Sequence, residues 1–499
     1  MTFPFDRLEK MNISISKLVT DSRTVQAGDT FIAYPGEGLD GRAYIDEAIA
    51  HGANAVIWEQ RDFEWSDQWR VANLGVTDLR HKAGWLANAV YGAPSEKLWM
   101  VGVTGTNGKT STSHWIASVL SNAGKKCALI GTLGNGFADD LQSTINTTPD
   151  AVRTHRLLAE YREGGAQAVA MEVSSHALSQ DRVNGVNFDV AMLTNLSRDH
   201  LDYHGDMQGY ADAKRKLFDW DHLKYAVLNF DDAYGVVLSE ELQDAPVEVI
   251  GYGLSDDALQ HAENLGVRMV YGNILEMGGD GLKISVHSSW GAIQIDSGLI
   301  GRFNASNLLG SLATLLVSGI ALDAAANSLG EVAPVAGRME RVGGGQQPTV
   351  IVDYAHTPDA LEKVLSALRE ANKGSGMLLC VFGCGGDRDR GKRPMMGSVA
   401  EKNSDFCVVT SDNPRKEDPQ AIVAEIVGGM SGQNHEIVID RAEAIQLAIK
   451  RAKQGDIVLI AGKGHEDYQE ILGVRHPFSD IQSARRSLAS VQNTAEVST

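Results

Sequence analysis

A glycine-rich loop in the first third of the chain constrains the fold more than any other feature. Residues 104–110 read TGTNGKT and stand between an apolar run, 98–103, and a helical pattern, 110–122. Glycines let backbone N–H groups approach phosphate oxygens, and the N-terminus of a helix adds partial positive charge. Lys109 can reach the outer phosphates of a nucleotide, and the Thr110 hydroxyl can ligate Mg²⁺. The strict phosphate-loop motif is not met, because valine stands at its first glycine position. A structural glycine turn is therefore the alternative.

Short apolar runs alternate with helical patterns along the rest of the chain. This alternation predicts an α/β fold with parallel sheets covered on both faces. The expected domains are a small α/β unit at 1–88, a domain carrying the loop at 89–336, and a Rossmann-like domain at 337–499. The uncharged stretch 303–322 is long enough to span a bilayer, but its Asn, Ser, Thr and Gly residues predict a buried helix instead. The expected strands are 98–103, 168–173, 190–193, 226–229, 349–353, 377–382, 406–410 and 457–461.

Charge and cysteine content narrow the function. The net charge of −19 argues against general binding to nucleic acid or to an anionic membrane, because both need a positive surface. Four cysteines are too few to cross-link 499 residues, and the first residues lack the basic-then-apolar order of a signal peptide, so we expect a cytoplasmic protein. Cys380 and Cys384 are close enough in sequence to suggest a metal pair, but buried thiols are the expected alternative.

Several further blocks accompany the loop. They are MEVSSH at 171–176, TNLSRDHLDYHG at 194–205, GRME at 337–340, DYAHTP at 353–358 and DNPR at 412–415. Together and in this order they resemble the Mur ligases, whose relatives include the folylpolyglutamate synthetases. The resemblance implies a three-domain Mur ligase architecture, in which 1–88 binds a UDP-linked substrate, 89–336 binds ATP and 337–499 binds an amino acid. It also implies amide formation through an acyl phosphate, with ATP and Mg²⁺, by a monomer.

The resemblance assigns residues to the nucleotide and metal. The catalytic set is Lys109, Glu172, His200, Lys214 and Arg338, and Lys214 is expected to carry an N6-carboxylate. The metal set is Thr110, Glu172, His200 and Lys214. The ATP set is Gly105, Thr106, Asn107, Gly108, Lys109, Thr110, Ser111, Asn304, Arg338 and Asp353.

Four of these assignments have a simpler alternative. Glu172 could cap the following turn, and His200 could be a hydrogen-bonded loop histidine. Lys214 could be a solvated helix lysine, since Arg215 and Lys216 stand beside it. Arg338 could form an interdomain salt bridge.

Two substrate sets follow from the same resemblance. UDP-N-acetylmuramoyl-L-alanyl-D-glutamate is expected at Thr20, Ser22, Glu37, Gly38, Leu39, Asn146, Thr147, Thr148, Ser174, Gln180 and Arg182, although Glu37 and Gly38 depart from the usual loop. Thr147 and Thr148 could instead cap a helix starting near Pro149. Meso-2,6-diaminopimelate is expected at Arg388, Asp412, Asn413, Pro414, Arg415, Gly462 and Glu466.

The DNPR block favours diaminopimelate over lysine as the added amino acid. Diaminopimelate has a second carboxylate that lysine lacks, and an arginine such as Arg415 can bind a carboxylate through two parallel hydrogen bonds. A turn with a solvated Arg415 is the simpler interpretation. A lysine-adding Mur ligase, a folylpolyglutamate synthetase, a nucleotide-dependent switch or phosphotransferase, and a non-catalytic scaffold remain alternative functions.

Overall fold

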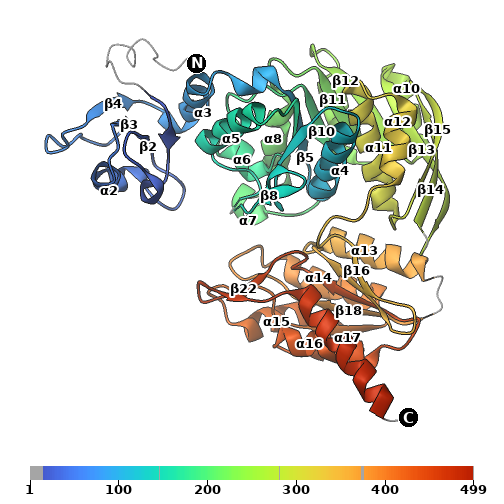
Figure 1. Cartoon of the computed structure of the whole chain (residues 1–499). Coiled ribbons are helices and arrows are strands. Elements are labelled where there is room, and N and C mark those ends of the chain that lie inside the picture. The colour runs from blue at the N-terminus through green and yellow to red at the C-terminus, as the bar shows by residue number, and fades with distance from the viewer. Residues whose placement is uncertain (1–14, 145, 280, 373–375, 498–499) are drawn as a thin grey trace.

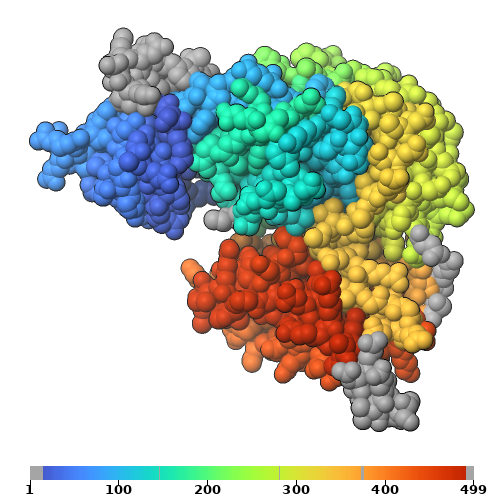
Figure 2. All heavy atoms as spheres, in the orientation of Figure 1, coloured from blue at the N-terminus to red at the C-terminus, as the bar shows by residue number. Residues whose placement is uncertain are grey.

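The computed structural model describes residues 15–144, 146–279, 281–372 and 376–497, with side chains described as far as residue 490. The N-terminal residues used in the signal-peptide argument lie outside these ranges. Three sheet domains follow one another along the chain, and both outer domains border the central one (Figure 1). A hollow separates the first domain from the third in the space-filling view (Figure 2).

The first domain is a small parallel sheet with the order β1-β2-β3-β4. The strands β1 to β3 are buried, and the apolar faces of the sheet pack against two helices, α2 (Ile45–Ala50) and α3 (Leu79–Val90). The strands are β1 (Leu18–Val19), β2 (Thr30–Ala33), β3 (Ala55–Glu59) and β4 (Ala72–Val76).

The central domain has an 11-stranded sheet in the order β15-β14-β13-β12-β11-β10-β5-β9-β6-β7-β8. The central part of this sheet, β13-β12-β11-β10-β5-β9-β6, is parallel throughout, as predicted. Parallel pairing requires crossover connections that return the chain to the same end of the sheet before each new strand. Antiparallel strands extend both edges and were not predicted. The strands are β5 (Trp99–Thr104), β6 (Cys127–Gly131), β7 (Gly134–Phe137), β8 (Asp140–Gln142), β9 (Ala168–Glu172), β10 (Val190–Leu193), β11 (Tyr225–Asn229), β12 (Glu248–Gly253), β13 (Arg268–Gly278), β14 (Gly281–Ser288) and β15 (Gly291–Ser297).

Helices cover both faces of this sheet and enclose two apolar cores. On one face α4 and α11 lie against the strands, and on the other α5, α9 and α10 do so (Figure 1). The helices are α4 (Lys109–Asn122), α5 (Ala151–Glu163), α6 (Ser175–Ser179), α7 (Leu201–His204), α8 (Met207–Arg215), α9 (Ala233–Glu241), α10 (Asp256–Leu265), α11 (Arg302–Val317) and α12 (Leu322–Gly330).

The single helix predicted over 303–322 is wrong in its extent. Helix α11 ends at Val317, and Gly319 turns the chain with a φ of +82° before α12 begins at Leu322. Glycine adopts this left-handed conformation without a steric penalty, so it ends the helix. The prediction that the stretch is buried is confirmed. Within the described ranges, no helix combines the length and apolar character needed to cross a membrane.

The third domain is Rossmann-like, as predicted, with the strand order β16-β17-β21-β18-β19-β20. Only the edge strand β16 is antiparallel. The strands are β16 (Glu340–Gly343), β17 (Thr349–Asp353), β18 (Leu378–Phe382), β19 (Phe406–Val409), β20 (His435–Ile437), β21 (Ile457–Ala461) and the hairpin β22 (Tyr468–Ile471) with β23 (Val474–Pro477). The helices are α13 (Pro358–Ala371), α14 (Lys392–Asn403), α15 (Pro419–Val427), α16 (Arg441–Arg451) and α17 (Asp480–Val497).

The four cysteines are buried free thiols, as expected. Burial raises the pKa of the Cys380 thiol well above its ordinary value, which disfavours the thiolate that binds metals. Among the described residues, no group of three or more His, Cys, Asp or Glu side chains could hold a metal by itself.

Candidate active site

The glycine loop joins the end of β5 to the start of α4, where the sequence predicts a phosphate site. Gly105 has a φ of +141° and Gly108 a φ of +91°. A Cβ added at Gly105 would lie 1.9 Å from the Thr194 hydroxyl oxygen, and one at Gly108 would lie 2.7 Å from Asn307 Oδ1. Both positions therefore need glycine. Lys109 Nζ folds back on the loop and donates to the carbonyl oxygens of Gly105 and Thr106 at 2.7 and 2.8 Å.

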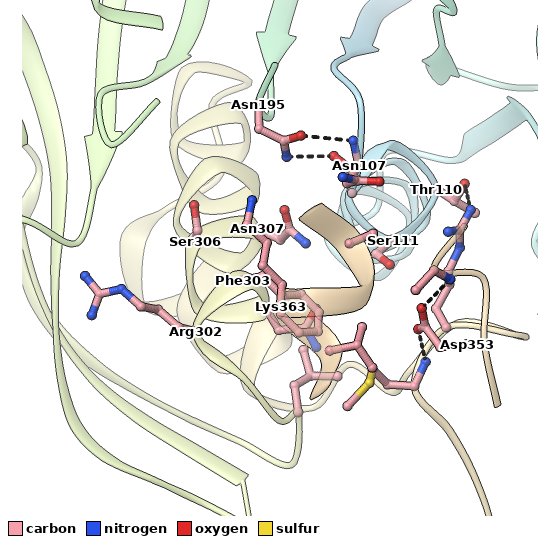
Figure 3. Close-up of a pocket in the computed structure, with 18 of the residues that line it drawn as sticks. Asn107, Thr110, Ser111, Asn195, Arg302, Phe303, Ser306, Asn307, Asp353 and Lys363 are labelled. Carbon is pink, nitrogen blue, oxygen red and sulfur yellow. Dashed lines mark hydrogen bonds between the residues drawn. The ribbon is translucent and has the colours of Figure 1, made fainter. Parts of the chain in front are cut away.

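Asn107 and Asn195 hold the loop in place through a reciprocal pair of hydrogen bonds (Figure 3). The Asn107 backbone N–H donates to Asn195 Oδ1, and Asn195 Nδ2 donates to the Asn107 carbonyl, both at 3.0 Å. Thr194 Oγ1 donates to the same carbonyl at 2.6 Å. The end of β10 thus fixes the loop. This role of Asn195 was not predicted, because it depends on two strands that are distant in the sequence but adjacent in the sheet.

Glu172 ends β9 beside the loop and is fully buried. Its Oε2 accepts from the Thr110 hydroxyl at 2.9 Å and the Thr132 hydroxyl at 3.0 Å, and its Oε1 accepts from the Thr132 backbone at 2.7 Å. No described N–H of 173–175 donates to it, so the alternative of a turn-capping carboxylate is wrong. A carboxylate beside a hydroxyl suits Mg²⁺, which commonly takes one or two protein carboxylates and fills its remaining positions with phosphate and water oxygens.

Lys214, on α8, is not the solvated lysine that its neighbours suggest. Its side chain is only 1% exposed, and Nζ donates to the Gly105 carbonyl at 2.8 Å. Nζ also lies 4.4 Å from the centre of the Tyr210 ring. Burial, reinforced by the positive charge of Lys109, holds the pKa of the Lys214 amine well below its ordinary value. This lowering shifts the equilibrium toward the neutral amine, the form that reacts as a nucleophile.

His200 stands at the border between the central and third domains. Its Nε2 lies 3.3 Å from Asp199 Oδ2, and burial lowers the pKa of the imidazole to about 3 despite that carboxylate. The third domain places His356 Nε2 3.6 Å and Lys392 Nζ 3.8 Å from the carboxylate of Asp199. Burial alone would raise the pKa of Asp199, but His356 and these neighbouring charges lower it. The loop-histidine alternative for His200 stays open, since the pairing with Asp199 fits both interpretations.

A cavity of about 310 Å³ opens beside the loop (Figure 3). Apolar side chains of α11, α13 and nearby segments line it, among them Phe303, Leu299 and Val364. Gly105, Thr106 and Lys109 do not line it. Members of the predicted ATP set that do are Asn107, Gly108, Thr110, Ser111, Asn304, Arg338 and Asp353.

Asn307 also lines this cavity and was not predicted. It stands three residues after Asn304 on α11, and this spacing places two side chains on one helix face. The spacing is the sequence signal that could have found it. Asn304 itself donates to the carbonyl of Ile300 at 2.9 Å.

Arg338 connects the third domain to the phosphate loop. Its guanidinium donates to Thr110 Oγ1 at 3.3 Å and lies over the Tyr354 ring at 4.4 Å. Within the described part of the chain it has no carboxylate partner at ion-pair distance, so the predicted alternative of an interdomain salt bridge is wrong. Asp353 supports the segment after Arg338 by accepting from the backbone of Met339 and Ala355, each at 2.8 Å.

A second cavity, of about 170 Å³, lies between the central and third domains. Asp199, His200 and Asp202 form its central-domain wall. Arg415 has a φ of +50° and donates to the Gly386 carbonyl at 2.8 Å, which excludes the solvated-turn alternative. From the predicted diaminopimelate set, Arg388, Asp412, Asn413, Arg415, Gly462 and Glu466 line this cavity, whereas Pro414 does not.

The predicted UDP-substrate residues fall into two groups. The first lies around Thr148, whose hydroxyl donates to the Glu172 carbonyl at 2.7 Å and accepts from the Ser174 backbone at 3.1 Å. Arg182 donates to the Thr148 carbonyl and to Gln180. Asp150, rather than either threonine, caps α5, so the helix-cap alternative is wrong. Thr147 joins this group through a 3.1 Å contact between its hydroxyl and that of Thr132.

The second group comes from the first domain. Glu37 accepts from Gln180 at 2.8 Å and from the Tyr203 hydroxyl, so the loop departing from the family pattern reaches the central domain. Ser22 is buried and donates to Glu47. Gly38 is exposed, and Leu39 is 70% exposed. Thr20 lines a separate cavity of about 450 Å³ between the two domains, together with Asn146 from the central domain.

Comparison with known proteins identifies the family. The Mur ligase family catalytic domain matches residues 14–91, the Mur ligase middle domain matches 103–315, and the Mur ligase glutamate ligase domain matches 337–464. The chain belongs to the Mur ligase family.

Two relatives within this family match nearly the whole chain and share one enzyme name. One from Chromobacterium violaceum is 50% identical over 484 residues, covering 97% of this chain and 96% of its own. One from Neisseria meningitidis serogroup A is 46% identical over 474 residues, covering 94% of each chain. Both are named UDP-N-acetylmuramoyl-L-alanyl-D-glutamate–2,6-diaminopimelate ligase.

Solved structures also match this chain over nearly its whole length. A structure of a ligase with that same name has a TM-score of 0.67 and 36% identity, covering 99% of this chain and 100% of its own. MurF ligase from Thermotoga maritima in complex with ADP has a TM-score of 0.65 at 20% identity, covering 95% of this chain and 98% of its own, and it supports the fold alone.

Proposed function

We propose that this chain is an ATP-dependent ligase that joins meso-2,6-diaminopimelate to UDP-N-acetylmuramoyl-L-alanyl-D-glutamate. The observation that carries the proposal is the cavity shared by two domains. Arg415, Asn413 and Glu466 face it from the third domain, and Asp199 with His200 face it from the domain that carries the phosphate loop. The relatives and the solved structure that carry this activity in their names match nearly the whole chain, which supports the same activity here.

ATP would occupy the 310 Å³ cavity with its phosphates at the glycine loop. The apolar side chains suit the base, and the Asn304 amide can both donate to and accept from its edge. Lys109 would leave the loop carbonyls to reach the outer phosphates. Arg338 would bring a positive charge from the third domain to the transferred phosphoryl group, so that the site is complete only when the domains are closed.

Mg²⁺ fits the oxygen set at Thr110 and Glu172, with His200 and a carboxylated Lys214 as the further proposed ligands. When bound, it would neutralise phosphate charge and polarise the transferred phosphoryl group. Glu172 would keep the Thr110 hydroxyl oriented through the 2.9 Å bond between them.

Lys214 would be carboxylated on Nζ. Its neutral amine attacks CO₂ and loses one proton, leaving a carbamate with one negative charge. The lowered pKa of the amine supports this step, since only the unprotonated form has the lone pair that attacks. The carbamate would be one of the proposed Mg²⁺ ligands, and the cation would compensate its charge.

The UDP-linked dipeptide would extend from the first domain toward Thr148, Ser174 and Arg182. There an oxygen of one of its D-glutamate carboxylates attacks the γ-phosphorus of ATP, which gives an acyl phosphate and ADP. The amine of diaminopimelate then attacks the acyl carbon, forming the amide and releasing phosphate. We also propose that the enzyme acts as a monomer in the cytoplasm. Sedimentation of the purified chain tests the monomeric state.

Selectivity would rest on the distal end of diaminopimelate. Arg415 and Arg388 offer positive charge to its carboxylate, while Glu466 offers a carboxylate oxygen to its ammonium group. Lysine has the ammonium group but no carboxylate there, so it would leave the arginines unpaired. A site built to bind such a group can reject an analogue without it by about 10⁴-fold.

An assay of ADP release tests the proposal. ADP should form only when ATP, the UDP-linked dipeptide and diaminopimelate are all present, and lysine should support far less turnover. ADP release without an amino acid would favour a nucleotide switch or phosphotransferase. Turnover with lysine equal to that with diaminopimelate would contradict the proposed specificity.

A further inference from the structure

A buried lysine stands directly behind the second cavity. Lys463 follows the end of β21, and its side chain is fully buried. It does not line the cavity, yet it bonds two side chains that do. Its Nζ donates to Asn413 Oδ1 at 3.0 Å and to Glu466 Oε2 at 2.8 Å.

These bonds decide which way the Asn413 amide points. Oδ1 accepts from Lys463 Nζ and from the Glu470 backbone at 2.9 Å, while Nδ2 donates to Glu466 Oε2 at 2.8 Å. A flipped amide would face two donors with its own N–H₂ group and lose all three bonds. Lys463 and the Glu470 backbone together therefore fix the Asn413 orientation that this site presents.

The same lysine holds Glu466. Lys463 Nζ and Asn413 Nδ2 both bond Oε2, and the Glu466 backbone donates to the Lys463 carbonyl at 3.0 Å in a tight turn. Across the described residues, no hydrogen bond to Oε1 is present. That oxygen is the acceptor left for a ligand, and the glutamate side chain is still 18% exposed toward the cavity.

We propose that Lys463 is a positioning residue for amino-acid selection: it holds the Glu466 carboxylate, directly and through the Asn413 amide, so that Glu466 Oε1 is a preset acceptor for the distal ammonium group of the incoming amino acid. A buried ammonium group costs desolvation energy, and well-packed apolar side chains often serve stability equally well. A buried charged lysine at position 463 is explained if it orders Asn413 and Glu466, the two side chains that line the amino-acid cavity. The inference rests on the proposed function, because it specifies how the same site selects its amino acid.

The test compares Lys463→Met with Lys463→Arg and with the unaltered enzyme. Methionine keeps most of the side-chain volume but no donor, so Asn413 and Glu466 lose their shared partner. The KM for diaminopimelate should rise about 10- to 100-fold, while kcat and the KM values for ATP and the UDP-linked dipeptide stay within about threefold. Arginine keeps the charge and the donors, so its KM for diaminopimelate should fall between the other two.

A double-mutant cycle with Glu466→Gln sharpens the test. If Lys463 acts through Glu466, the Lys463→Met effect on the KM for diaminopimelate should be much smaller in the Glu466→Gln background. Lys402→Met, the same change at an exposed lysine on α14, is the matched control and should leave all three KM values unchanged. Should Lys463→Met not fold, Lys463→Gln, which keeps a donor without the charge, carries the same comparison.

Two results would overturn the inference. One is an unchanged KM for diaminopimelate in a folded Lys463→Met protein, and the other is an equal rise for all three substrates, which would indicate a purely structural role. Absence of diaminopimelate-dependent turnover in the unaltered enzyme would instead contradict the proposed function, so the two failures are distinguishable.

Discussion

The phosphate loop and the DNPR loop build their sites in different ways. At the phosphate loop, close backbone approach shapes the site, since Gly105 and Gly108 leave no room for a Cβ. At the DNPR loop, side chains shape the site: Asn413 and Arg415 are set by bonds to Glu466, Lys463 and Gly386. Backbone N–H groups suit the binding of phosphate, which every relative that uses ATP must bind. Side chains suit the choice among amino acids, because one substitution can change what they accept.

Lys214→Ala is the change with the largest expected effect on the phosphate side. Without the buried amine there is no carbamate, and kcat should fall about 10³-fold. Short carboxylates added to the buffer should restore part of the activity by occupying the space left by the side chain. Lys216→Ala, at an exposed neighbour, is the control. Full activity of Lys214→Ala, measured as ADP release, would contradict the proposal that activity requires a carbamate on Lys214.

Arg415→Ala tests the amino-acid side. Loss of the guanidinium leaves the distal carboxylate of diaminopimelate unpaired, so kcat/KM for diaminopimelate should fall about 10²-fold. Equilibrium binding of ATP should not change. Lys416→Ala removes a neighbouring exposed cation that does not line the cavity and should leave both quantities unaltered. A parallel loss of ATP affinity would show that the two regions are not separate.

Gly108→Ala tests the claim that backbone approach shapes the nucleotide site. The added Cβ meets Asn307 Oδ1 at 2.7 Å in a conformation that already strains an L-residue, and ATP binding should weaken about tenfold. Gly124→Ala is the matched control. Gly124 has a φ of +85°, but its Cβ would meet nothing within 4 Å. Equal ATP affinity of the two variants, measured by calorimetry, would argue against the steric explanation.

Glu37→Gln should have the smallest effect. Glu37 connects the first domain to Gln180 and Tyr203, but its side chain is partly exposed and its ion pair with Arg80 spans 3.5 Å. The KM for the UDP-linked dipeptide should rise only about two- to fivefold, with no change for diaminopimelate. Glu64→Gln, at an exposed site of the same domain, is the control. A raised KM for diaminopimelate instead would show that this loop acts on the amino-acid site and not on the site of the UDP-linked dipeptide.

The same contrast explains what the sequence could predict. The phosphate loop was recognisable because glycine, lysine and threonine stand together in one short segment between a strand and a helix. Lys214 was not recognisable from its neighbours, since its burial depends on Gly105 and Tyr210, far away in the sequence. Likewise, only the fold brings Lys463 to Asn413. The break between α11 and α12 was missed because hydrophobicity continues through Gly319, while its backbone turns.

Isotope transfer tests the central claim most directly, namely that a substrate carboxylate oxygen attacks the γ-phosphorus of ATP within this site. The UDP-linked dipeptide is prepared with ¹⁸O in all oxygens of both D-glutamate carboxylates, and the phosphate released during turnover with diaminopimelate is examined by mass spectrometry. The account predicts one ¹⁸O in each phosphate, with the other oxygen of the reacting carboxylate retained in the new amide carbonyl. Phosphate without ¹⁸O would contradict it.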